Sequence, residues 1–137
     1  MHHTINTRRI AVPPALSTQQ LSAIRAELDH QRRFRTEQLD ELAVDTTAAV
    51  AAGDEPRLQV AYALRLAAIS ALTAIDAALR RLEDGSYGTC ERCAEQIPWE
   101  RLEVLPMTGL CTHCQFLAES SQSNVPRRGA TRSPRWT

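Results

Sequence analysis

Two short stretches decide how this chain folds: Cys90-Glu91-Arg92-Cys93 and, after residues 94–110, Cys111-Thr112-His113-Cys114. Together they contain all 4 cysteines of the 137-residue chain. Two residues between a pair of cysteines let one tight turn direct both sulfurs at one ion, and the longer loop returns the second pair to complete a tetrahedron. The spacing therefore predicts one structural Zn²⁺ bound by Cys90, Cys93, Cys111 and Cys114.

Two other uses of the cysteines compete with zinc. A redox pair would be expected beside a βαβ pattern, and two disulfides would be expected in an exported chain. Neither a βαβ pattern nor an apolar leader is visible in the sequence. His113 lies inside the second pair, and the short turn is expected to point it outward. A zinc ion with four cysteines has no open position for water or substrate, so we do not predict an enzyme.

The residues before the cysteines predict two long helices. Ser17 or Thr18 is a suitable N-cap for the first helix, and Gly53 is a suitable residue to end it. Asp54 is then a suitable N-cap for a second helix, which runs from about Glu55 to Asp84. Because the turn between the helices is so short, they must pack antiparallel.

Apolar residues of the second helix recur with nearly a seven-residue spacing, which is typical of a coiled coil. Folding at Gly53 sets Leu28 near Leu79 and Leu42 near Leu64. The end of the hairpin is rich in alanine and is expected to be its least stable part. No apolar run was expected to approach the length needed to span a membrane. The residues of the second helix that recur with the nearly seven-residue spacing are Leu58, Ala61, Leu64, Ala68, Leu72, Ile75, Leu79 and Leu82.

These patterns predict a mainly α fold, in which a long antiparallel hairpin precedes a small four-cysteine zinc finger and a short helix. We expect a flexible N-terminal arm over 1–16 and the coiled-coil hairpin over 17–84, with its tip near 46–54. The finger and short helix should cover 85–119, and a disordered basic tail 120–137. The finger is too small to fold without its metal, and its expected core is Ile97, Leu102, Leu105 and Leu110.

Charge is distributed unevenly, although the formal net charge is +0. The two ends are basic and the middle is acidic, which makes the chain a poor binder of duplex DNA. We therefore expect no sequence-specific DNA binding, and at most weak contact of the C-terminal tail with nucleic acid. Reduced cysteines and the lack of an export signal favour the cytoplasm.

The segment Asp84-Gly85-Ser86-Tyr87-Gly88-Thr89-Cys90-Glu91-Arg92-Cys93 resembles the entry to the four-cysteine zinc finger of the DksA/TraR family. Ile97, Arg101 and Pro106 stand at matching positions before the second cysteine pair. The resemblance covers about residues 75–117. It implies a transcription regulator that binds RNA polymerase and inserts its helical hairpin into the secondary channel, with the zinc finger as a structural base.

The chain departs from this family at the hairpin tip. The best-known members carry an Asp-x-x-Asp-x-Ala motif there, and the corresponding positions of this chain are Thr47, Val50 and Ala52. The nearest acids are Asp45, Asp54 and Glu55, and of these Asp45 and Asp54 are candidates for partner binding. Asp54 has a structural explanation as an N-cap, and Asp45 is either a solvated helix residue or a partner contact. The resemblance therefore implies polymerase binding without the usual aspartate pair.

Three residues near the zinc site are further candidates for partner binding. Arg92 and Arg101 either balance the negative zinc–thiolate centre or contact a partner. Trp99 either covers the core of the finger or anchors a partner. Two other functions stay open beside polymerase binding: a protein or RNA interaction module, for example on the ribosome, and a redox sensor that releases zinc when its thiolates are oxidised.

Overall fold

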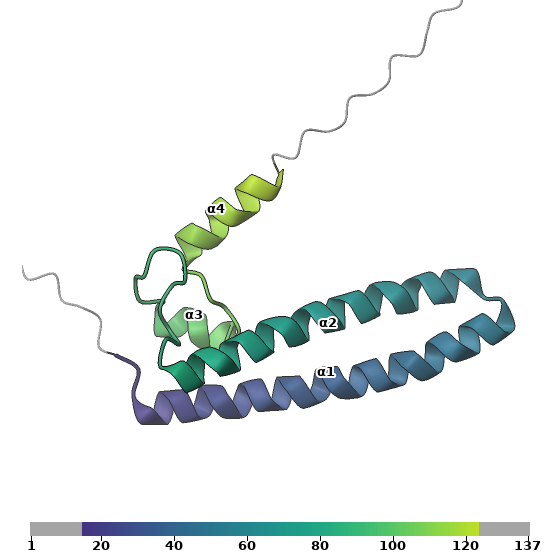
Figure 1. Ribbon diagram of the computed structural model, residues 1–137, viewed down its shortest axis with the longest axis horizontal. Helices are drawn as coiled ribbons and strands as arrows, with labels where there is room; N and C mark the ends of the chain where they lie inside the picture. The colour runs from purple at the N-terminus through teal and green to yellow at the C-terminus, as the bar shows by residue number, and fades with distance from the viewer. Residues whose placement is uncertain (1–14, 124–137) are drawn as a thin grey trace, which may run out of the picture.

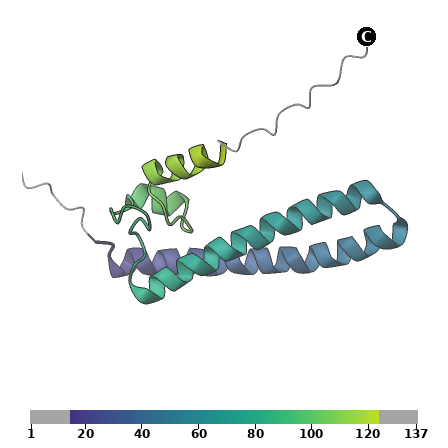
Figure 2. The ribbon, with the colours of Figure 1, turned by 45° about the horizontal axis from the view of Figure 1, so that its top comes forward.

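The computed structural model describes residues 15–123, and within them the fold is helical. Four helices follow one another: α1 Thr18–Ala52, α2 Glu55–Asp84, α3 Trp99–Val104 and α4 Thr112–Ser123. Helices α1 and α2 form a long antiparallel hairpin, and the zinc-finger segment with α3 and α4 lies beside its base (Figure 1). The turned view shows the same arrangement, with the far half of the hairpin free of the finger (Figure 2). The predicted mainly α fold is confirmed.

Helix α1 begins and ends where the sequence predicts. The Ser17 hydroxyl accepts a hydrogen bond from the Gln20 N–H at 3.1 Å, and the Gln20 side chain accepts one from the Ser17 N–H at 2.9 Å. This reciprocal pair satisfies two N–H groups that the helix itself leaves unbonded. At the other end Gly53 has a φ of 64°, a left-handed conformation that glycine adopts without steric cost.

Helix α2 is bounded by the same kinds of signal. The Asp54 carboxylate accepts a hydrogen bond from the Arg57 N–H at 3.2 Å, as an N-cap does. Gly85 ends the helix with a φ of 80°. The N–H groups of Ser86 and Tyr87 then both donate to the carbonyl of Arg81 at 3.1 Å, which turns the chain towards the finger.

One buried cluster joins the hairpin base to the finger. The finger rests directly on the hairpin base, so the two parts share a core instead of having one each. Metal ligands belong to this cluster, which ties the zinc site to the packing of the helices. Its members are Ile24, Leu28, Ile75, Ala78, Tyr87, Cys90, Ile97, Leu102 and Cys114.

The far half of the hairpin is packed by small residues. Ala49 of α1 and Ala61 and Ala68 of α2 are buried there, with Leu42 as their one large buried neighbour. Leu42 is 8% exposed whereas Leu64, its predicted neighbour, is 44% exposed, so the two leucines are not buried to the same extent. Alanine at the facing positions lets the two helices approach closely, and the larger leucine side chain is left at the edge of the contact.

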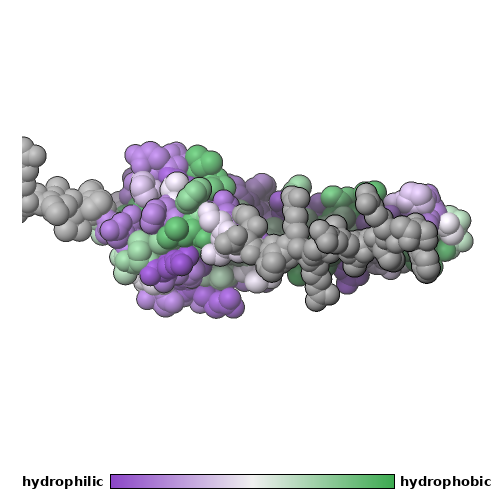
Figure 3. All heavy atoms as spheres, turned by 90° about the horizontal axis from the view of Figure 1, so that it is seen from above, coloured by the Kyte–Doolittle hydropathy of each residue, from purple (hydrophilic) through white to green (hydrophobic). Residues whose placement is uncertain are grey.

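Several large apolar side chains of α2 face outward, and Figure 3 shows apolar residues along the hairpin. An 18-residue window of α2 has a mean hydropathy of 1.6 and is long and apolar enough to cross a membrane by length and composition. The expectation that no apolar run approaches this length was therefore wrong. Alanine raises the hydropathy, and Arg65 is the one charged residue between Leu58 and Ile75. In the structure this helix is one arm of the hairpin.

The finger differs from the sequence-based expectation in three places. Helix α3 was not predicted, Leu105 is 42% exposed and so lies outside the core, and α4 continues through residues 120–123, which were expected in the disordered tail. Ile97 and Leu102 are buried as predicted. Residues 1–14 and 124–137, with most of the predicted arm and tail, lie outside the described residues.

Candidate zinc site

The four cysteines converge on one point. Their sulfur atoms all lie within 4.8 Å of one another, and the Sγ atoms of Cys93 and Cys111 are 3.8 Å apart. A zinc ion with four sulfurs at about 2.3 Å in a tetrahedron requires sulfurs about 3.8 Å apart, so the arrangement fits this ion. The predicted set of Cys90, Cys93, Cys111 and Cys114 is the group brought together, and it forms a site for one Zn²⁺.

The first cysteine pair sits in a tight turn held by backbone hydrogen bonds. The Cys90 N–H donates to the Glu95 carbonyl at 2.8 Å, and the Ala94 N–H donates to the Cys90 carbonyl at 2.9 Å. Ala94 has a φ of 62°, a left-handed conformation that is strained for any residue with a Cβ. The turn therefore holds the two sulfurs on one side at a small cost in backbone strain.

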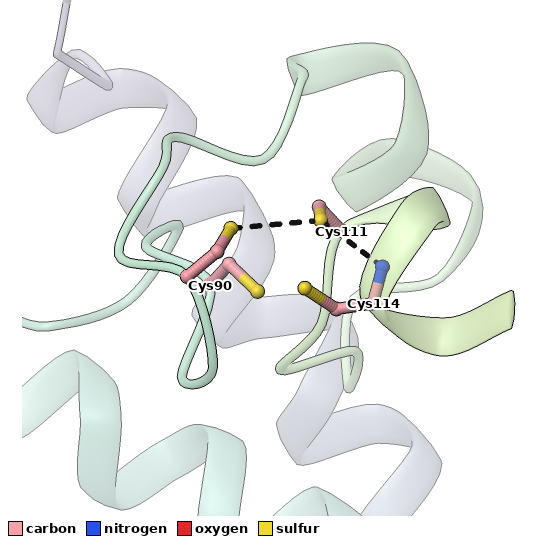
Figure 4. Close-up of side chains that lie close together, drawn as sticks. Cys90, Cys111 and Cys114 are labelled. Atoms are coloured by element: carbon pink, nitrogen blue, oxygen red, sulfur yellow. Dashed lines mark hydrogen bonds between the residues drawn. The ribbon is translucent and has the colours of Figure 1, made fainter. Parts of the chain in front are cut away.

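The second cysteine pair uses the start of a helix. Cys111 directly precedes α4 and Cys114 lies in its first turn, where the Cys114 N–H points at the Cys111 sulfur at 3.4 Å. Figure 4 shows the sulfurs of Cys90, Cys111 and Cys114 directed towards a common space between the two segments. Helix N–H groups aimed at a thiolate stabilise its negative charge. His113 is exposed and, among the described residues, is not part of the metal cluster.

In the metal-free site the cysteine thiols differ in acidity. A backbone hydrogen bond from Cys111 lowers the pKa of Cys90 to about 6, whereas burial raises the pKa of Cys114 to about 12. Four sulfurs this close cannot all carry charge unless a cation compensates them. Zn²⁺ supplies that charge and binds all four as thiolates, which is why it would order the segment as a structural ion.

Arg81 joins the zinc finger to the hairpin, and sequence reasoning missed it. The residue is 8% exposed, its Nη1 lies 3.4 Å from Glu91 Oε1, and its Nη2 donates to the Met107 carbonyl at 3.2 Å. Gly109 makes room for this pair, since a Cβ there would lie 2.6 Å from Glu91 Oε2. In the sequence Arg81 follows Arg80 and looks like a solvated helix residue, so no local signal identifies it.

Tyr87 ties the two loops of the finger together. Its hydroxyl donates to the Pro106 carbonyl at 2.7 Å and is buried. Burial raises the pKa of Tyr87 to about 12, because the charged phenolate would be removed from water. The contact holds the chain before Cys90 against the chain before Cys111.

The three finger residues proposed for partner binding have different surroundings. Arg101 Nε donates to the Leu110 carbonyl at 3.1 Å, beside the ligand Cys111. Trp99 begins α3 and is partly buried against the shared core, while Arg92 is exposed. Arg101 therefore hydrogen-bonds to the backbone beside a zinc ligand. Contacts of Arg92, Trp99 and Arg101 with a partner stay predictions.

Two acids near the hairpin tip, Asp45 and Asp54, form hydrogen bonds with one arginine, Arg57. Arg57 Nε donates to Asp45 Oδ1 at 3.0 Å, its Nη2 contacts the same oxygen, and its N–H is capped by Asp54. The hydrogen bond and charge of Asp45 raise the pKa of Arg57. Thr47 and Val50, at the positions of the family's aspartates, are exposed and uncharged. Asp45 and Asp54 thus make contacts inside the hairpin, while a further acid, Glu55, is exposed in the first turn of α2. The tip lacks an aspartate pair at the family's positions.

Fold and site together define a four-cysteine zinc-finger protein built on a long helical hairpin. Residues 85–120 match the profile of the prokaryotic dksA/traR C4-type zinc finger. An uncharacterised protein of Aquifex aeolicus is 50% identical over 62 residues, which are 44% of this chain and 43% of that protein. The RNA polymerase-binding transcription factor DksA of Haemophilus influenzae is 39% identical over 51 residues, 37% of this chain and 35% of that protein.

The whole fold also has a solved counterpart. The transcription factor DksA2 from Pseudomonas aeruginosa superposes with a TM-score of 0.68 at 25% sequence identity, over 79% of this chain and 89% of that one. The predicted resemblance to the DksA/TraR family is therefore confirmed, in the finger by sequence and in the hairpin by structure. The segments matched by sequence span under half the length of the two curated relatives.

Proposed function

We propose that this chain is a transcription regulator of the DksA/TraR type, which binds RNA polymerase and places its hairpin in the secondary channel. The observation that carries the proposal is the superposition on DksA2 across both hairpin and finger. A matching finger alone would support only a shared zinc site. The cytoplasm, where the polymerase is found, is part of the same proposal.

The tip sets this proposal apart from the usual action of the family. Asp45 is paired with Arg57 and Asp54 caps α2, so neither acid is presented as part of an aspartate pair. We infer that the chain occupies the channel without presenting an aspartate pair to the catalytic centre. Such a regulator would limit access through the channel and compete with relatives that carry the aspartates.

The test is co-purification of the zinc-loaded chain with core RNA polymerase, with and without a protein that fills the secondary channel. We expect binding that the competitor displaces. The matched variant is T47D/V50D, which places acids at two exposed positions without touching the hairpin core. It should bind equally and gain an effect on open-complex lifetime. Absence of polymerase binding at physiological salt would contradict the proposal.

An RNA or protein interaction module remains a second candidate, favoured by the missing aspartate pair and the basic residues near the C-terminus. It predicts sedimentation with ribosomes or RNA that depends on the basic residues of 120–137. Most of these residues lie outside the described part of the chain. Sedimentation that is unchanged after this segment is removed would count against the second candidate.

A further inference from the structure

A cleft that plays no part in the proposed function lies between the start of α1 and the first loop of the finger. Its volume is ≈ 510 Å³, and its surface is mixed: Leu16, Ile97, Pro98 and Trp99 supply apolar area, and Gln20, Thr89 and Gln96 supply polar groups. Glu100 is the one charged residue among the described residues that line it. The zinc ligands are not part of its wall, and it lies at the opposite end of the hairpin from the tip.

The chain that precedes α1 is already seated at this cleft. Leu16 packs against the shared core, and a Cβ at Gly88 would lie 3.0 Å from Leu16 Cδ1 and 3.6 Å from Leu102 Cδ1. Gly88 has a φ of 86°, so glycine is required there for its conformation as well as for the close approach of Leu16. Leu16 therefore fixes the chain at the edge of the cleft close to the point where the described residues begin.

The residues before Leu16 include arginines and prolines, which complement the carboxylate and the indole that line the cleft. They read Arg8-Arg9-Ile10-Ala11-Val12-Pro13-Pro14. Proline restricts both itself and the residue before it to extended conformations, and such segments bind grooves lined by aromatic side chains. At about 3.3 Å per residue, the segment from Arg9 to Leu16 reaches across a cleft of this size. Its two arginines complement the lone carboxylate of Glu100.

We propose that residues 8–14 bind in this cleft of the same chain, with Val12 and Pro13 against Trp99 and the arginines towards Glu100. The segment then forms an outer layer of the zinc finger and shields the partly buried indole. Seating against Leu16 makes the contact intramolecular, so only a short stretch needs to be ordered and the effective concentration is high. The inference concerns the isolated chain and does not depend on polymerase binding.

The experiment uses the full zinc-loaded chain with Trp136→Phe, which leaves Trp99 as its one tryptophan. Acrylamide quenching of Trp99 fluorescence is compared between this parent and the variant I10D/V12D. Covering of an indole removes much of its surface from solvent, so we expect quenching to rise at least about twofold in the variant. The matched control is I5D, which makes the same kind of change outside the proposed segment and should quench like the parent.

Two further measurements show what causes a change in the quenching of Trp99. A synthetic peptide of residues 1–14, added in excess to I10D/V12D, should restore protection of Trp99, which supports the proposal. Equal quenching of the parent and I10D/V12D would overturn it. Protection that appears in the parent only after core RNA polymerase is added would also overturn it, and would identify the cleft as a site for a partner segment. Neither result bears on whether the hairpin enters the channel.

Discussion

At Ala94, the backbone of the first cysteine turn adopts a left-handed conformation with a φ of 62°. A residue with a Cβ loses about 1–2 kcal/mol there, and glycine loses part of that gain through its freer unfolded chain. We therefore expect Ala94→Gly to stabilise the zinc-loaded finger by up to about 1 kcal/mol. Thermal unfolding of the zinc-loaded chain would measure it. Ala94→Val introduces a β-branched residue and should be less stable than the parent. A Val variant more stable than the Gly variant would contradict backbone strain at this position.

The buried hydroxyl of Tyr87 predicts a dependence of stability on alkaline pH. Its folded pKa is raised to about 12, above its ordinary value of 10.0, so the neutral phenol stabilises the fold below pH 10. This contribution is lost as the pH rises through about 12. Tyr87→Phe should lower the free energy of unfolding by about 1 kcal/mol near neutral pH, because the Pro106 carbonyl loses its donor.

The measurement is denaturant unfolding of Tyr87→Phe and of the parent at several pH values between 8 and about 12. The difference between them should shrink as the phenol of the parent ionises. Tyr62→Phe is a suitable control, because Tyr62 is 48% exposed on α2. A difference that stays constant over the whole range would contradict the burial of the Tyr87 hydroxyl.

Helix ends were the most predictable elements of this fold. Ser17, Gly53, Asp54 and Gly85 act through local backbone chemistry, which the sequence displays directly. The exposure of Leu64 could not be predicted, because seven-residue spacing identifies a helix face but the neighbouring alanines decide how close the partner helix comes. Helix α3 was missed because six residues are too few for a periodic pattern to be visible.

The two halves of the hairpin should respond very differently to the loss of a leucine side chain. Leu28 is 0% exposed in the base, and Leu64 is 44% exposed in the far half. Leu28→Ala should cost about 2–5 kcal/mol of unfolding free energy, since it leaves a cavity in the shared core. Leu64→Ala should cost less than about 1 kcal/mol. Equal costs in chemical unfolding would contradict the uneven packing.

On the scale of the whole molecule, the orientation of the finger on the hairpin depends on contacts that no sequence motif predicts. The zinc ligands were predictable because cysteine spacing reflects the geometry of the metal. Arg81 was not, because its partners Glu91 and Met107 are distant in sequence and meet it only in the folded chain. The contacts of Arg81 and the shared buried core together set how the finger sits on the hairpin base.

Arg81→Met should therefore loosen this alignment without removing the metal. The Met107 carbonyl loses its donor, and a buried group left without a partner costs about 1–3 kcal/mol. Small-angle scattering should show a broader range of shapes, and amide exchange should rise in residues 86–110, while zinc content stays unchanged. Arg80→Met is the matched control, because the neighbouring arginine is exposed. Loss of zinc from Arg81→Met would contradict a role confined to the alignment of the two parts.

The cluster that holds Leu28 and Ile75 together with Cys90 and Cys114 has a consequence for the living cell. Because one core serves both parts, whatever stabilises the metal-bound finger also stabilises the hairpin base, and weaker hairpin packing must weaken the hold on zinc by the same free energy. The fraction of molecules with a properly built hairpin base then follows the supply of free zinc. A cell that runs short of the metal would lose working copies of this protein while its total amount stayed constant.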